Sequence, residues 1–176
     1  MVALTGMTIA EARHVVRSDY LGRPVEIGGH LSRASFAQLQ ALTADAPATA
    51  GATDAPIAQV AVDGFRKYLR GGVECVAIPL EKPGHYSACV SSQGGCAMAC
   101  SYCATGTMGL MRNLGTHEIL DQVKTIAADL PAGARVAGVV FQGMGEPMAN
   151  LDAVLQAIAV LNDSCAFGID ARKMTV

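Results

Sequence analysis

The stretch THEILDQVKTIAADLPAGARVAGVVFQGMGEP, residues 116–147, decides the fold class of this chain. Its first half spaces apolar residues as on one face of a helix, and the Pro131-Ala132-Gly133 turn ends that helix. The run from Val136 to Phe141 is continuously apolar, as in a strand buried on both faces of a parallel sheet. A second amphipathic helix follows and ends near Asn162. The alternation predicts an α/β fold with a parallel sheet and right-handed crossovers.

The flanking segments extend this pattern in both directions. Upstream we expect a strand over 87–91, a long glycine- and cysteine-rich loop over 94–109 and a helix cap at Thr116. Downstream, a third strand is expected to begin at Arg172.

An antiparallel sheet is expected before the alternating part. The segment IAQVAVDGFRKYLRGGVECVAIPL, residues 57–80, is interrupted by Asp63-Gly64 and Gly71-Gly72, both of which favour tight hairpin turns. It predicts a three-stranded antiparallel meander. Further upstream, short helices are expected within the first 40 residues or so, followed by a linker rich in Ala, Thr and Pro over 41–56. We therefore expect three parts, at 1–56, 57–86 and 87–176.

Composition excludes several classes of protein. With 176 residues, 51% of them hydrophobic, and a mean hydropathy of +0.33, the chain is neither disordered nor a coiled coil. There are 13 basic and 15 acidic residues and no run of Lys or Arg, so composition alone argues against nucleic-acid binding. There is no signal-peptide pattern at the start and no apolar stretch of about 18 residues, so an intracellular soluble protein is expected.

The cysteines predict a metal site. Four of the six lie between positions 89 and 103, and Cys96, Cys100 and Cys103 have the spacing C-x3-C-x2-C. Three thiolates on one short loop can bind three irons of a [4Fe–4S] cluster and leave the fourth iron open. A structural zinc site, with Cys89 or His85 as fourth ligand, is an alternative, as are buried free thiols. The remaining Cys75 and Cys165 are expected to be core thiols.

This triplet, with Tyr102 before its last cysteine, resembles the hallmark of the radical S-adenosylmethionine (radical SAM) superfamily. The segment CVSSQGGCAMACSYCATGTMGLMRNL, residues 89–114, resembles more narrowly the dual-specificity RNA methyltransferases that methylate C2 of an adenine in 23S rRNA and tRNA. The motifs DGFRKYL, VECVAIP and GMGEP extend the resemblance over about 61–176. Relatives that methylate C8 of the same adenine look similar.

The resemblance implies two cofactors, a [4Fe–4S] cluster and S-adenosylmethionine. Cys96, Cys100 and Cys103 match the cluster ligands, and the open iron would bind the amino and carboxylate groups of S-adenosylmethionine. Gly145 and Glu146 match the turn that holds the cofactor's ammonium group. From the residues alone, a plain tight turn remains the alternative for this glycine pattern.

The resemblance also implies two catalytic residues. Cys89 matches a resolving cysteine that breaks the covalent RNA adduct, and a thiol at a strand end beside a cationic cofactor is placed to ionise. Glu74 matches a glutamate that accepts a proton. Without the resemblance, Cys89 would be interpreted as a core thiol and Glu74 as an outward-facing strand carboxylate.

The fold implied is a truncated partial (β/α) barrel of about two and a half βα units, preceded by the meander and the short N-terminal helices. The part from 87 to 176 would be the start of the radical SAM core, whose family form has six units. The serine turn after the third strand and the methyl-bearing cysteine would lie beyond Val176. We therefore predict that this chain alone does not methylate RNA. A non-catalytic metal- or SAM-binding fragment or paralogue is the alternative.

The expected partners also follow from the resemblance. They are 23S rRNA, tRNA and an electron donor for the cluster. A monomer in the cytoplasm or an organelle, without membrane contact, is expected.

Overall fold

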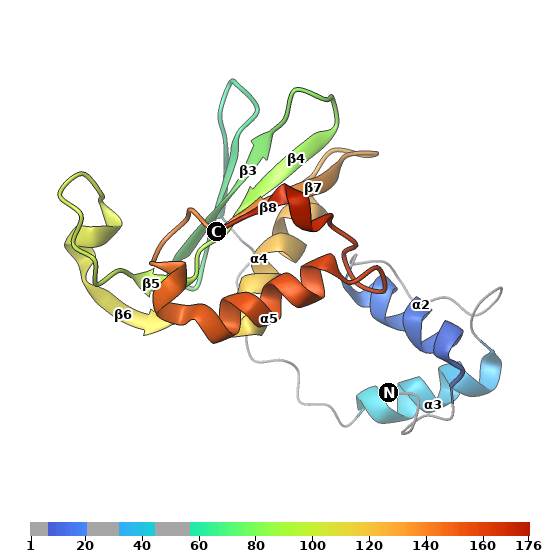
Figure 1. Cartoon of the computed structure of the whole chain (residues 1–176). Coiled ribbons are helices and arrows are strands. Elements are labelled where there is room, and N and C mark those ends of the chain that lie inside the picture. Colours follow the sequence, from blue (N-terminus) through green and yellow to red (C-terminus); the bar gives the residue numbers. More distant parts are fainter. Residues whose placement is uncertain (1–6, 21–31, 45–56) are drawn as a thin grey trace.

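The computed structural model describes residues 7–20, 32–44 and 57–176, and all structural statements concern these residues (Figure 1). The α-helices are α2 (Ile9–Tyr20), α3 (Arg33–Ala44), α4 (Thr116–Asp129) and α5 (Leu151–Asn162). The strands are β1 (Ile57–Val60), β2 (Arg66–Arg70), β3 (Val73–Pro79), β4 (His85–Cys89), β5 (Gln93–Gly95), β6 (Leu110–Asn113), β7 (Arg135–Val140) and β8 (Met174–Thr175). Short 3-10 helices are η1 (Thr105–Met108), η2 (Pro147–Asn150) and η3 (Ala171–Lys173).

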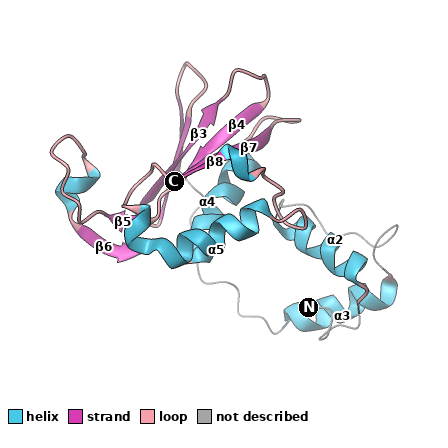
Figure 2. Cartoon of the chain, viewed as in Figure 1, coloured by secondary structure: helices cyan, strands magenta, loops and turns pink. Residues whose placement is uncertain are grey.

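One six-stranded sheet, in the order β1-β2-β3-β4-β7-β8, forms the body of the molecule (Figure 2). Strands β1 to β4 pair antiparallel in sequence order, whereas β4 with β7 and β7 with β8 are parallel. Gly64, Gly71 and Gly72 have positive φ at the predicted hairpin turns. The predicted mixed α/β fold, with its meander and parallel part, is confirmed.

The core lies between this sheet and the helices α4 and α5. Helix α4 packs against α5 and against β3, β4 and β7. Along β3, the residues Val73, Cys75 and Ala77 are buried, while the alternate residues are half-buried, because successive side chains point to opposite faces. The sheet therefore has one covered face and one more open face. Cys75 is in the core as predicted, but Cys165 is half-buried after α5, so its prediction as a core thiol is wrong.

The region predicted as one long loop over 94–109 contains regular structure. Strands β5 and β6 form a separate two-stranded antiparallel sheet, and η1 lies between them. In Figure 1 this arm extends away from the main sheet. The sequence did not indicate these strands, because β5 is Gln-Gly-Gly and β6 is Leu-Met-Arg-Asn, and neither alternates apolar and polar residues as a half-buried strand does.

Several predicted element ends differ from the structure. The strand expected over 87–91 is β4, which runs over His85–Cys89. Gly115, not Thr116, caps α4, and its N–H donates to the Glu118 carboxylate at 2.9 Å. The last strand begins at Met174 rather than Arg172, because residues 171–173 form η3. The predicted linker overlaps the end of α3, and its residues 45–56 lie outside the described part of the chain.

The predicted boundary between residues 86 and 87 falls inside β4, which pairs with the meander on one side and with β7 on the other. The two parts therefore share one sheet, and their division stays a prediction. Within the described residues, no helix combines the length and apolar character needed to cross a membrane.

Candidate functional site

Two backbone segments leave the sheet side by side at the carboxyl ends of the parallel strands β4 and β7. They are residues 90–93 and the turn Gly143-Met144-Gly145-Glu146-Pro147, which we call the GMGEP turn. The N–H of Gly143 donates to the Val90 carbonyl at 3.0 Å, and the N–H of Ser92 donates to the Met144 carbonyl at 2.9 Å. Ligand sites of parallel sheets form at this edge, so we take it as the candidate site.

Both glycines of the turn are needed because the two segments touch. A Cβ on Gly143 would lie 2.8 Å from the backbone N of Ser91, and a Cβ on Gly145 would lie 2.7 Å from the backbone N of Gln93. Gly145 also has a φ of 95°, in the region that favours glycine. The glycine pattern is therefore more than a plain tight turn, because any side chain at either position would separate the turn from residues 90–93.

Three consecutive polar residues beside the turn are fully buried. Ser91, Ser92 and Gln93 are at most 2% exposed. The Gln93 side chain accepts the Glu146 N–H at 2.9 Å and donates to the Asn113 side chain at 2.8 Å. Sequence reasoning missed this cluster, because a Ser-Ser-Gln triplet in a glycine-rich stretch looks like a solvated loop. The weak signal was that it directly follows an apolar strand.

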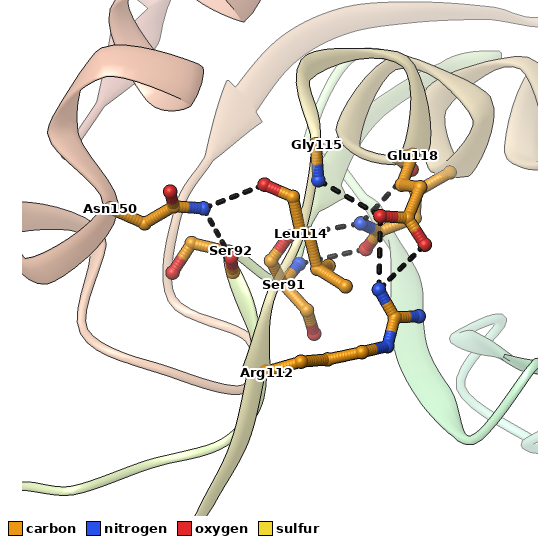
Figure 3. Close-up of polar contacts among 8 residues, drawn as sticks. Ser91, Ser92, Arg112, Leu114, Gly115, Glu118 and Asn150 are labelled. Atoms are coloured by element: carbon orange, nitrogen blue, oxygen red, sulfur yellow. Dashed lines mark hydrogen bonds and ion pairs between the residues drawn. The ribbon is translucent and has the colours of Figure 1, made fainter.

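The Arg-Asn-Leu sequence at 112–114, for which the sequence suggested no role, joins the arm to the sheet (Figure 3). Arg112 forms an ion pair with Glu118 at 2.8 Å, and Leu114 is 2% exposed in the core. Asn150 donates to the carbonyls of Ser92 and Leu114, each at 2.8 Å. These contacts fix the base of the arm against the GMGEP turn.

Glu146 has a structural contact of its own. One of its carboxylate oxygens accepts the Met148 N–H at 3.0 Å, at the start of η2. The side chain is half-buried. Glu146 therefore also caps a short helix, which is a structural role that it would have in a plain turn as well. Its second oxygen has no such contact with Met148.

The three cysteines of the triplet lie on one closed loop in the arm. The N–H of Cys96 donates to the Gly109 carbonyl at 3.0 Å, which joins the two ends of the loop. A Cβ on Gly95 would lie 1.9 Å from that same carbonyl oxygen, so only glycine permits the closure. Inside the loop, the Cys103 N–H donates to the Cys100 carbonyl at 3.0 Å. All three thiols are free of disulfides.

The thiols have the donor chemistry of a cluster site, but they are not gathered. Backbone N–H groups of Gly106 and Thr105 donate to the Cys103 thiol and lower its pKa, which favours the thiolate that binds metal. Yet no group of three or more Cys, His, Asp or Glu lies in metal-binding range in the described ranges. Cys96 is buried, whereas Cys100 and Cys103 are half-buried. The donor set fits the predicted cluster, and the loop conformation does not yet bring the donors together.

The zinc alternative takes either Cys89 or His85 as fourth ligand, and of the two only Cys89 lies at the end of β4 from which the chain continues to the cysteine loop. His85 begins β4 and Cys89 ends it, so about 13 Å of strand separates them. The His85 ring nitrogens contact the Pro83 carbonyl and the Arg135 guanidinium, both at 3.1 Å. His85 is therefore not a ligand candidate for the cysteine loop.

The two predicted catalytic residues lie on the same face of neighbouring strands. Cys89 pairs with Val76 of β3, and Glu74 is two residues away from Val76, so both point to the more open face. Burial raises the pKa of the Cys89 thiol, although a backbone hydrogen bond from Gln142 opposes this, so burial by itself disfavours the thiolate. Glu74 forms an ion pair with Lys67 at 2.6 Å, a partner that the sequence analysis did not identify.

Comparison with known proteins finds a family whose model matches part of the chain. The model of the radical SAM superfamily matches residues 90–173. These residues are part of a radical SAM domain. This domain contains the cysteine loop and the GMGEP turn, and the resemblance seen in the sequence is confirmed. A probable RNA methyltransferase of Sorangium cellulosum is 60% identical over 125 residues, covering 66% of this chain and 32% of that protein.

Two further proteins are similar to this chain. The probable dual-specificity RNA methyltransferase RlmN of Gloeobacter violaceus is 52% identical, over 66% of this chain and 33% of that protein. The crystal structure of a radical SAM methyltransferase from Sphaerobacter thermophilus superimposes with a TM-score of 0.73 and 29% identity, covering 99% of this chain and 52% of that one. The chain thus spans about a third to a half of the length of the relatives it matches.

Proposed function

We propose that this chain carries the cluster- and SAM-binding part of an RNA methyltransferase that modifies C2 of an adenine in 23S rRNA and tRNA. The observation that carries the proposal is that two elements, the GMGEP turn and the cysteine loop, attach to the same short segment of the chain. The GMGEP turn packs on Gln93, and the cysteine loop begins three residues later at Cys96. A radical SAM site needs a cluster and a site for the methionine part of its cofactor next to each other.

Cys96, Cys100 and Cys103 would hold a [4Fe–4S] cluster, which supplies one-electron chemistry when bound. The lowered pKa of Cys103 supports this role, and cluster binding would draw the three thiols together. Gly145 and Glu146 would hold the ammonium group of S-adenosylmethionine. An acceptor-only carboxylate suits a cation.

Glu74 would accept the proton from the adenine carbon, and Cys89 would act as the resolving thiol. Their common face and neighbouring strands support joint action at one substrate. Since burial raises the pKa of Cys89, a nearby cationic cofactor would favour its thiolate. The ion pair with Lys67, at 2.6 Å, would hold the Glu74 carboxylate in place at this face of the sheet.

The RNA partners, an electron donor, a monomeric state and a cytoplasmic location belong to the proposal as well. RNA methyltransferases among the relatives support the RNA partners. The proposed division keeps a helical part at 1–56, a meander at 57–86 and the beginning of the radical SAM core at 87–176.

The test is anaerobic reconstitution of the chain with iron and sulfide, followed by electron paramagnetic resonance with and without S-adenosylmethionine. We expect close to four irons per chain and a reduced-cluster signal that shifts when the cofactor binds. Glu146→Gln should keep the iron but weaken the shift. Bound zinc, or iron retained after Cys100→Ser, would contradict the cluster assignment.

Methyl transfer is tested separately on adenine-containing rRNA and tRNA fragments. Because 2-methyl- and 8-methyladenosine have the same mass, the nucleosides are separated by liquid chromatography against standards before mass spectrometry. The prediction is that the chain alone gives neither product. An 8-methyl product would favour the C8 relatives, and a 2-methyl product would overturn the predicted inactivity while supporting the C2 assignment.

A further inference from the structure

Ser91 is a buried serine that bonds to three separate parts of the molecule. Its hydroxyl donates to the backbone carbonyl of Glu74 in β3 and accepts the N–H of Met144 in the GMGEP turn at 2.8 Å. Its backbone N–H donates to the Gln122 side-chain oxygen of α4 at 2.8 Å, and its carbonyl accepts from the Gln122 amide nitrogen at 2.9 Å. One residue thus joins a strand, a helix and the turn.

The turn rests directly on this hydroxyl. A Cβ on Gly143 would lie 2.6 Å from the Ser91 oxygen, so no side chain fits between them. Ser91 is 0% exposed and Gln122 is 9% exposed, so water does not replace these bonds. A buried polar network whose members are all satisfied fixes a single arrangement of the elements it joins. The position of the turn relative to the end of β3 therefore depends on Ser91.

The neighbouring Ser92 provides an internal contrast. It is also buried, at 2% exposure, and its backbone bonds to Met144 and Asn150. Its hydroxyl, however, has no hydrogen-bond partner among the described residues. Figure 3 shows the two serines next to each other beside helix α4. They share residue type, burial and location, and they differ in what the hydroxyl does.

We propose that Ser91, held by Gln122, is a positioning residue that sets the GMGEP turn against the strand bearing Glu74 and thereby tunes the binding of S-adenosylmethionine. This inference rests on the proposed function, in which the turn binds the cofactor's methionine part. A turn contributes its full share of the binding free energy only when its groups are already held in the geometry of the bound state. Gln122 touches no residue of the turn in these contacts, so it would act only through Ser91.

The experiment measures the dissociation constant of S-adenosylmethionine from the cluster-loaded chain. The shift of the reduced-cluster resonance serves as the binding signal. Ser91→Ala leaves the Met144 N–H without a buried acceptor, and we expect the dissociation constant to rise about tenfold with iron content unchanged. Ser92→Ala, the matched control, should change it by less than about twofold. Gln122→Met keeps the approximate shape of the side chain but loses both hydrogen bonds of its amide group to Ser91. This change should raise the dissociation constant about threefold.

The outcomes separate the two proposals. If the unaltered chain binds neither cluster nor cofactor, the proposed function fails. If it binds both and Ser91→Ala behaves like Ser92→Ala, only the positioning role is overturned. Should Ser91→Ala fail to fold, Gln122→Met decides, because it leaves the serine in place. An unchanged dissociation constant in a folded Gln122→Met variant would then contradict the proposal.

Discussion

The GMGEP turn and the cysteine loop differ in how completely packing and hydrogen bonds position their functional groups. The turn is tied to residues 90–93 by backbone and side-chain hydrogen bonds, and its two glycines allow direct contact. The cysteine loop 96–109 is closed at its base, but its thiols are not brought together. Packing and hydrogen bonding suffice to form a backbone turn, whereas a cluster site is completed only when the metal binds and draws its deprotonated ligands together.

Substitution of Gly145 should have the largest effect on stability. In Gly145→Ala, the new methyl group would meet the Gln93 backbone and the residue would keep an unfavourable positive φ. We expect a loss of about 3 kcal/mol of unfolding free energy, measured by chemical denaturation. Gly133→Ala is the control, because Gly133 has a φ of 82° but open space, and should cost about 1 kcal/mol. Equal costs would mean that contact with residues 90–93 is unimportant.

Asn150→Ala should have the next largest effect, because it removes two bonds from the base of the arm. The carbonyls of Ser92 and Leu114 would each lose a donor. The expected loss is about 2 kcal/mol by denaturant titration, and Asn150→Asp should be at least as harmful, since it replaces the donor with an acceptor. If Asn150→Ala leaves the free energy of unfolding unchanged, the turn region is held by its glycines alone.

The Arg112–Glu118 contact should give a smaller, pH-dependent effect. Burial alone would raise the pKa of Glu118, but the Gly115 N–H and the Arg112 guanidinium outweigh it and hold that pKa below its ordinary value of 4.5. The contribution is therefore complete above pH 4.5 and is lost as the pH falls through the lowered pKa. Arg112→Ala should cost at most about 1 kcal/mol at pH 7, since the pair is partly exposed.

The pH dependence of that effect is measured by thermal unfolding between neutral and acidic pH. Glu118→Gln should show a flatter profile than the unaltered chain over the acid range. A variant whose profile stays as steep as that of the unaltered chain would assign the acid sensitivity to other carboxylates.

Cys100→Ser should have the smallest effect on the stability of the metal-free chain, within about 0.5 kcal/mol, because Cys100 is only half-buried. The same change should abolish iron binding, measured by iron and sulfide analysis after reconstitution. Cys165→Ser, which alters a half-buried cysteine outside the loop, should keep the iron. A large loss of stability in metal-free Cys100→Ser would mean that the loop is already as tightly built as the turn.

The sequence predicted the parts of this molecule that have a strong apolar pattern. The helices α4 and α5 and the strand β7 lie close to the expected residues because long periodic segments dictate their own structure. Motif spacing also marked the cysteines and the GMGEP turn. The sequence did not reveal β5, which is Gln-Gly-Gly, or β6, whose four residues are all exposed, nor the buried Ser91–Gln122 network. Burial of polar residues depends on partners distant in sequence, and local patterns do not contain that information.

The most direct test of the difference between turn and loop is hydrogen–deuterium exchange, resolved by residue, on the chain before and after anaerobic cluster loading. We predict that the amides of Gly143 and Met144 exchange slowly in both states, because both already donate to buried acceptors. Amides over 99–102 should become slow only after loading, whereas Cys103, Gly106 and Thr107 already donate hydrogen bonds within the loop. If the turn exchanges as fast as the cysteine loop in the metal-free chain, the claim that the turn is formed before the cluster binds is contradicted.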